Sequence, residues 1–239
     1  MQDSKDQIHI KTDRDTITIL HGAAYVHNPE SFDYGLQSLQ GVLDLIGRKG
    51  DSQKTVVFYN DANIQVILDD TITDRSKDTA LYSFANSIAY THWKNIFGKA
   101  FQQKELIDFL KNHPEDIVGG VDSLISAVSK LKITTEIVGD YWYDDNNNIT
   151  FMFKSKDGEG AASIPAKITL CVPIFNESDF VPQMEVELQL NKPKAETEKP
   201  TIVLTCPRME FYRKAAVDFT VNALKEALPG FLIMAGSPR

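Results

Sequence analysis

The chain has 239 residues with 25 basic and 33 acidic side chains, so its formal net charge is −8. Hydrophobic residues make up 42% and charged residues 24%, which is typical of a folded globular protein and excludes a disordered chain. The acidic balance excludes a protein that coats duplex DNA through many phosphate contacts, but it leaves room for a local basic patch. No stretch approaches the roughly 20 apolar residues of a membrane span, and the start lacks the apolar region of a secretory signal. We therefore expect a cytoplasmic protein with no membrane contact.

The first quarter of the chain predicts strands followed by a helix. Residues 7–27 alternate irregularly between apolar and polar side chains, which indicates one or two strands. A helix is expected to begin at the capping residue Asn28, with Pro29 at its first position, and to end near Gly47. From Phe32 to Ile46, apolar residues recur at steps of three and four, which is typical of an amphipathic helix.

The middle of the chain continues with a hairpin. Residues 54–70 contain two apolar runs around four turn-forming residues, and residues 79–84 predict another strand. Residues 85–98 fit either a short helix or an irregular aromatic segment. Residues 104–113 predict a helix that ends before Pro114, because the residue before a proline avoids helical angles.

Beyond a further helix over residues 121–131, the apolar period changes to two. This change predicts a long hairpin and three more strands, at 133–143 with 149–156, then at 164–175, 181–190 and 201–205. A last helix is expected over residues 208–228, and residues 231–235 form either a terminal strand or a packed tail.

Strand runs and helix runs are segregated along the chain and do not alternate. This order predicts an α+β fold, with a mainly antiparallel sheet and helices on one of its faces. We expect a single domain over residues 1–239, with residues 1–6 and 236–239 as flexible ends.

Three stretches carry a resemblance to a known family. They are the hairpin from Thr55 to Asp70, the segment from Tyr82 through His92-Trp93-Lys94 to residues 101–117, and the segment from Ile164 to Phe175 with the strand and the strand-to-helix unit that end at Leu224. In pattern and order these stretches resemble the YfdQ-like family of uncharacterised phage and prophage proteins. That family tends to place a histidine–arginine pair where this chain has Asp74-Arg75-Ser76-Lys77-Asp78, without a histidine.

The resemblance implies a phage-derived accessory protein in the cytoplasm of a bacterial host, encoded near genes for phage recombination or replication. It implies no catalytic residue. The sequence likewise indicates no catalytic residue, because the chain has no GxSxG, P-loop or GxGxxG motif. The cysteines Cys171 and Cys206 lie in apolar runs and are expected to be reduced core residues. Since no Cys/His cluster has zinc spacing, we expect no metal and no cofactor.

Carboxylates and a histidine are the first candidates for chemistry. Asp69, Asp70, Asp74 and Asp78 cluster after a strand, which is where metal-dependent nucleases hold their acidic ligands. We favour a solvated loop, because no lysine follows at the spacing of a nuclease site. His92, beside Trp93, is either a buried hydrogen-bonded histidine or part of a site.

The most suggestive feature is an aromatic hairpin followed by lysines. Its residues are Tyr141, Trp142, Tyr143, Phe151, Phe153, Lys154 and Lys156. Exposed aromatic rings on a sheet beside lysines stack unpaired bases. The alternative is a cross-strand ladder in which one face packs into the core.

Together these observations predict a non-enzymatic accessory protein that binds single-stranded nucleic acid through a local patch. Two alternatives stay open: a factor that engages a host defence or replication protein, and a metal-dependent nuclease-like enzyme. An acidic, strand-rich chain of this kind is either a monomer or hides a sheet edge in a dimer.

Overall fold

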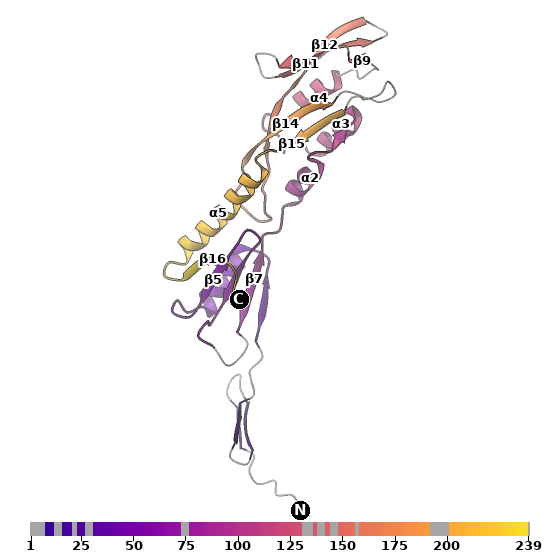
Figure 1. Ribbon diagram of the computed structural model, residues 1–239. Coiled ribbons are helices and arrows are strands. Elements are labelled where there is room, and N and C mark those ends of the chain that lie inside the picture. The colour runs from indigo at the N-terminus through magenta and orange to yellow at the C-terminus, as the bar shows by residue number, and fades with distance from the viewer. Residues whose placement is uncertain are drawn as a thin grey trace, which may run out of the picture. The chain divides into compact units, whose positions relative to one another are not determined.

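The computed structural model describes residues 8–11, 16–20, 23–26, 31–72, 77–130, 136–137, 142–143, 148–155, 158–191 and 201–238. By its internal contacts the chain divides into two compact units, which are described separately. Unit 1 comprises residues 1–84 and 220–239, and unit 2 comprises residues 85–219. The predicted α+β class is confirmed, because helices and mainly antiparallel sheets occur together (Figure 1). The single domain stays a prediction.

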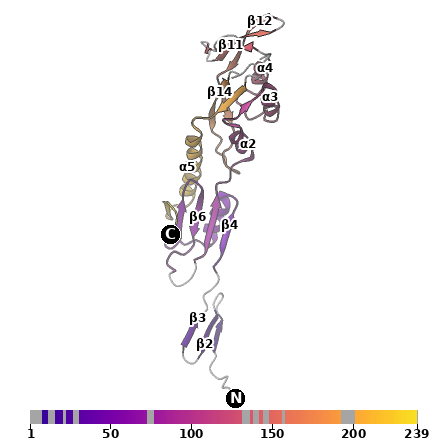
Figure 2. The ribbon, with the colours of Figure 1, turned by 45° about the vertical axis from the view of Figure 1, so that its right-hand side comes forward.

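The centre of unit 1 is a five-stranded sheet. Its strands are β4 (Asp33–Leu36), β5 (Val56–Tyr59), β6 (Asn63–Ile67), β7 (Thr79–Ser83) and β16 (Leu232–Ala235), in the order β16-β5-β6-β7-β4. Figure 2 labels β6 and β4 of this sheet. The predicted hairpin is confirmed as the antiparallel pair β5–β6. The side chain of Asn60 closes its turn, because its Oδ1 accepts from the backbone N–H groups of Ala62 and Asn63. The two edge strands, β16 and β4, pair in parallel with their neighbours.

Helices cover one face of this sheet. They are α1 (Leu39–Lys49) and residues 220–227 of α5 (Met209–Ala227). Lys49 at the end of α1 donates to the Tyr34 hydroxyl at 2.6 Å, and the Lys225 ammonium lies 5.2 Å from the centre of the Tyr59 ring. The side chains buried between these helices and the sheet include Val42, Ile46, Val57, Ile64, Val66, Ala80, Tyr82, Val221 and Leu224.

The predicted start of the first helix is wrong. Residues 33–36 form strand β4, and the helix begins only after Ser38, whose Oγ accepts from the N–H of Gly41 at 3.1 Å. Asn28 and Pro29, the predicted cap, lie outside the described residues. The helix also runs past Gly47 to Lys49. The apolar residues of this stretch fit a helical period. Parallel pairing with β7 nevertheless places residues 33–36 in the sheet.

The predicted strands near the start of the chain form a small antiparallel sheet of their own. Its members are β1 (Ile8–Lys11), β2 (Thr16–Leu20) and β3 (Ala23–Val26), with β2 in the middle.

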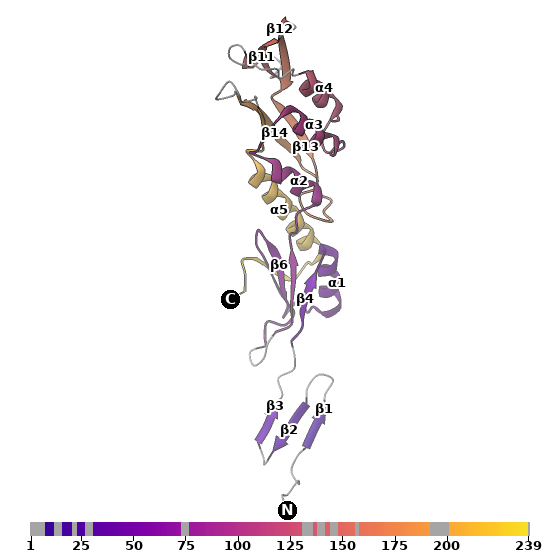
Figure 3. The ribbon, with the colours of Figure 1, turned by 90° about the vertical axis from the view of Figure 1, so that its right-hand side faces the viewer.

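Unit 2 is built around a four-stranded antiparallel sheet. The strands are β13 (Lys167–Cys171), β14 (Gln183–Asn191), β15 (Thr201–Thr205) and β8 (Ala100–Phe101), in the order β13-β14-β15-β8. Along β14 every second residue is buried, from Met184 to Leu190, while Glu185 and Glu187 alternate with them as predicted. Figure 3 shows α2 (Ile88–Ile96), α3 (Gln103–Lys111) and α4 (Asp122–Lys130) along one side of this sheet.

The structure decides one open point of unit 2 and corrects one predicted strand. Residues 85–98 contain helix α2, capped by Ser87, whose Oγ accepts from the N–H of Tyr90 at 3.0 Å. The predicted strand over residues 164–175 is instead two strands that meet at Ala166. The first is β12 (Gly158–Pro165), which pairs with β11 (Asn148–Ser155), and the second is β13. A proline cannot donate to the ladder, which suits Pro165 to this strand end.

Candidate functional site

The predicted aromatic hairpin exists as a strand pairing in unit 2. Strand β10 (Trp142–Tyr143) pairs antiparallel with β11, so that Trp142 lies opposite Thr150 and Tyr143 opposite Ile149. Further along β11, Phe153 and Lys154 lie opposite the strand β9 (Glu136–Ile137). The backbone register therefore agrees with the predicted hairpin.

The side chains that would make this hairpin a binding surface lie outside the described residues. This holds for Tyr141 and Lys156 as a whole and for the side chains of Trp142, Tyr143, Phe151, Phe153 and Lys154. A nucleic-acid contact at the hairpin thus stays a prediction.

The two other candidates, His92 and Trp93, are neighbours on α2 but differ in exposure. Trp93 is fully buried, and its Nε1–H donates to Oδ2 of Asp116 at 2.7 Å. His92 is exposed, and its ring lies edge-on to that of His113 with 5.2 Å between the ring centres. The same Asp116 Oδ2 lies 3.0 Å from Nδ1 of His113. One carboxylate therefore joins the buried indole to a partly buried imidazole.

Asp116 is positioned by the backbone of β13. The N–H of Cys171 donates to the Asp116 carbonyl oxygen at 2.7 Å, and Ile117 forms an isolated bridge with Leu170. These contacts hold the carboxylate where it can accept from both rings. The cluster fixes α2 and the end of α3 to the edge of the sheet, and it leaves His92 as the exposed member. Among the described residues, no group of three or more His, Cys, Asp or Glu side chains could hold a metal ion.

The predicted carboxylate cluster is engaged with neighbouring protein groups. Asp69 accepts from the backbone N–H and the hydroxyl of Thr71, and chiefly the hydroxyl bond lowers the pKa of this carboxyl below its usual value. Asp70 lies 2.7 Å from the ammonium of Lys77. Asp78 accepts from the N–H of Phe32 at 3.0 Å, while Asp74 lies outside the described residues. These contacts suit a solvated structural loop.

A surface that the sequence did not single out lies at the start of α5. Phe211 is 56% exposed, and the guanidinium carbon of Arg208 lies 4.3 Å from the centre of its ring. Tyr212 lies edge-on to Phe211, with 5.7 Å between the ring centres. A stacked cation and an exposed ring form a platform that accepts further planar groups. We call Arg208, Phe211 and Tyr212 the α5 platform.

Contacts with other residues of unit 2 hold the α5 platform in place. The Tyr212 hydroxyl accepts from the backbone N–H of Glu185 at 3.1 Å. Arg213 donates to the Asn86 side chain at 3.2 Å, and its guanidinium carbon lies 5.2 Å from the centre of the Phe175 ring. Helix spacing places Arg208 and Phe211 on the same side, because residues three apart are surface neighbours. The sequence signal was present as Arg-x-x-Phe, but exposure of the ring could not be read from it.

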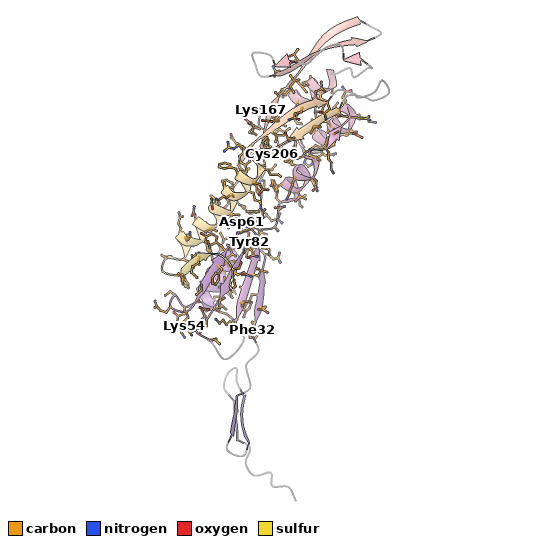
Figure 4. All side chains as sticks on the ribbon, in the orientation of Figure 1. Phe32, Lys54, Asp61, Tyr82, Lys167 and Cys206 are labelled. Atoms are coloured by element: carbon orange, nitrogen blue, oxygen red, sulfur yellow. The ribbon has the colours of Figure 1, made fainter. Side chains whose placement is uncertain are left out.

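Two groups close to the α5 platform are held in their neutral forms. Burial raises the pKa of the Cys206 thiol and that of the Tyr90 hydroxyl. A raised thiol pKa lowers the fraction of Cys206 in the thiolate form, so this cysteine is not an activated nucleophile. Both cysteines are free (Cys206 is labelled in Figure 4), and both are half-buried, so the prediction that they are core residues is wrong.

The chain belongs to a family described as uncharacterized conserved protein (DUF2303), whose model matches residues 36–238. The match includes residues of both units. No curated protein and no solved structure matches the chain. Within the described part of the chain, no helix has both the length and the apolar character that a membrane crossing requires.

Proposed function

We propose that this protein is a non-enzymatic accessory protein of phage or prophage origin that binds single-stranded nucleic acid through unit 2. The observation that carries the binding is the α5 platform, in which an arginine stacks on a ring that is more than half exposed. The phage origin and an action in the cytoplasm of the bacterial host rest on the resemblance to the YfdQ-like family.

The chemistry of the platform suits unpaired bases. A base that stacks on an aromatic ring contributes about 1–3 kcal/mol whatever its identity, because every base has a π-face. The guanidinium of Arg208 adds a cation–π contact and a charge for the adjoining phosphate. Paired bases offer no free face of this kind, so the proposal selects single strands.

The local charge supports the same ligand despite the acidic chain. Between residues 208 and 214 there are two arginines and one lysine against the single carboxylate of Glu210, which gives 3 − 1 = +2. Lys214 is exposed in this segment. A small basic patch of this size supports modest, salt-sensitive affinity. The predicted hairpin from Tyr141 to Lys156 would extend the contact within the same unit.

Fluorescence anisotropy with a labelled oligothymidylate of roughly 20 nucleotides tests the proposal, and we expect a Kd of about 1–100 µM at low salt. Phe211→Ala is expected to weaken binding about tenfold, because the base loses its stacking partner. Phe32→Ala is the matched control: Phe32 is 48% exposed in unit 1, with the Lys49 ammonium 5.8 Å from the centre of its ring.

Two further outcomes separate the parts of the proposal. If Trp142→Ala abolishes binding while Phe211→Ala has no effect, the predicted hairpin, and not the α5 platform, carries the function. If the wild-type protein gives no anisotropy change with either DNA or RNA single strands, nucleic-acid binding is refuted.

A further inference from the structure

Helix α5 and the loop before β14 together form an exposed aromatic pair in unit 2. The ring centres of Phe180 and Phe219 lie 5.2 Å apart, and the two rings are tilted by 32°. Phe219 is 44% exposed, Val181, which follows Phe180 in the chain, is also 44% exposed, and Phe180 is half-buried. We call Phe180, Val181 and Phe219 the Phe180–Phe219 patch. Aromatic side chains within a polar rim are typical of the centre of a protein interface.

The loop that carries Phe180 is held in place by its own hydrogen bonds. The N–H of Asn176 donates to the carbonyl oxygen of Ala85 at 2.9 Å, and the N–H of Phe180 donates to Oγ of Ser178 at 3.2 Å. Between these contacts Glu177 has a φ of 54°, in the left-handed region, so the chain turns sharply there. The ring pair is therefore presented by a fixed turn and a helix, and a partner does not have to order it first.

Three exposed carboxylates lie next to the patch in the chain. They are Glu177, Asp179 and Asp218. The first two stand shortly before Phe180 in the loop, and the third directly precedes Phe219 on α5. Residues 176–181 and 215–219 contain no lysine or arginine, so these two segments carry 0 − 3 = −3. In the described parts of the chain, none of the three carboxylates forms an ion pair, so the rim of the patch is acidic.

Charge distinguishes this patch from the α5 platform on the same helix. Every lysine and arginine of α5 lies more than one turn from Phe219. The segment from residue 208 to 214 carries +2, whereas the two segments of the patch carry −3. The patch therefore repels phosphate groups, which argues against a nucleic-acid strand as its occupant. A second copy of the chain is disfavoured as well, because a two-fold contact sets the same carboxylates against each other.

We propose that the Phe180–Phe219 patch docks a segment of a partner protein in which Lys or Arg flanks large aliphatic side chains such as Leu. The aliphatic side chains pack on the two rings, and the flanking cations meet the three carboxylates. A small cation such as a polyamine would satisfy the carboxylates but would leave the rings in water. The docking goes beyond nucleic-acid binding, because it requires neither Arg208 nor Phe211.

Two-dimensional NMR of the labelled full chain, titrated with capped peptides, tests the proposal. The peptide Lys-Leu-Lys-Leu-Lys is expected to shift the amide signals of residues 176–181 and 215–219 with a Kd of roughly 0.1–1 mM. Lys-Ser-Lys-Ser-Lys keeps the charge but lacks the apolar side chains, and it should bind at least about fivefold more weakly. Glu-Leu-Glu-Leu-Glu should not bind. Equal binding of the two lysine peptides would overturn the proposal, because charge alone would then explain the contact.

Substitutions separate the apolar and the acidic contributions. Phe219→Ala is expected to weaken Lys-Leu-Lys-Leu-Lys about fivefold, and Val181→Ser should weaken it as well without removing either ring. Asp179→Asn combined with Asp218→Asn should weaken the peptide about tenfold at low salt and reduce the salt dependence of its Kd. Val118→Ser is the matched control, because Val118 is 51% exposed elsewhere in unit 2, and it should leave the Kd unchanged. Thermal unfolding verifies that each variant is folded.

Three further results would overturn the proposal. Unchanged affinity for Lys-Leu-Lys-Leu-Lys in both Phe219→Ala and Val181→Ser would show that the peptide does not contact the patch. A dimer in sedimentation velocity that Phe219→Ala dissociates would make the occupant a second copy of the chain. Weaker binding of an oligothymidylate by Phe219→Ala would make the patch part of a nucleic-acid site. We expect the sedimentation and the oligothymidylate binding of this variant to match those of the wild type.

Discussion

Asp116 is the residue on which the packing of α2 depends most directly. Its carboxylate accepts from a fully buried indole and from an imidazole, and its own backbone is held by β13. Unit 2 thereby satisfies the one polar atom that Trp93 brings into the core. The carboxylate contributes more to stability here than it would at the surface, because its loss would leave the buried Trp93 N–H without an acceptor.

Asp116→Ala is therefore expected to lower the free energy of unfolding by about 1–3 kcal/mol, the penalty of leaving the buried Trp93 N–H unpaired. Chemical denaturation monitored by tryptophan fluorescence measures the change. Glu115→Ala, which removes the neighbouring exposed carboxylate, should change the stability by less than about 0.5 kcal/mol. Equal effects of the two substitutions would show that the indole bond does not stabilise the unit.

Single residues show what the sequence could not predict. His92 and Trp93 are adjacent, and the sequence could not decide between a core and a site role for the pair. The structure separates them, because Trp93 finds its acceptor 23 residues away at Asp116. In the same way, the exposure of Phe211 depends on how elements that are distant in the chain pack around it. The local sequence pattern does not predict contacts between residues that are this far apart in the chain.

At the scale of elements, the sequence predicts what local period and turn chemistry determine. The hairpin β5–β6, the helices α3, α4 and α5, and the alternation along β14 all follow from spacing that is visible in the chain. Strand β4 does not follow from local spacing, because its partner β7 lies more than 40 residues further along the chain. The apolar residues of this segment satisfy a helical period as well, so only tertiary pairing decides the outcome.

The true start of α1 gives an element-scale prediction. Ser38→Ala removes the acceptor for the N–H of Gly41 and is expected to lower stability by about 1 kcal/mol. Thermal or chemical unfolding measures the effect. Ser38→Asp keeps an acceptor at the cap and should restore wild-type stability. If Ser38→Ala unfolds as the wild type does, the helix does not depend on this cap.

At the scale of the whole molecule, the charge of −8 describes solubility more than function. The carboxylates of Asp69, Asp70 and Asp78 and those of the outer face of β14 are solvated or paired, while the sequence has a small positive excess at the start of α5. Unit 2 thus carries two surfaces of opposite local charge, the α5 platform and the Phe180–Phe219 patch.

Ultraviolet cross-linking of an oligothymidylate to the full chain, followed by peptide mapping, locates the residues that contact single strands. We expect cross-links in the tryptic peptide Met209–Arg213, which contains Phe211, with further cross-links in Ile133–Lys154 if the predicted hairpin takes part. Phe211→Ala should remove the first cross-link and spare the second. Cross-links confined to peptides of unit 1, or none under conditions in which a control single-strand-binding protein is labelled, would show that unit 2 does not bind single strands.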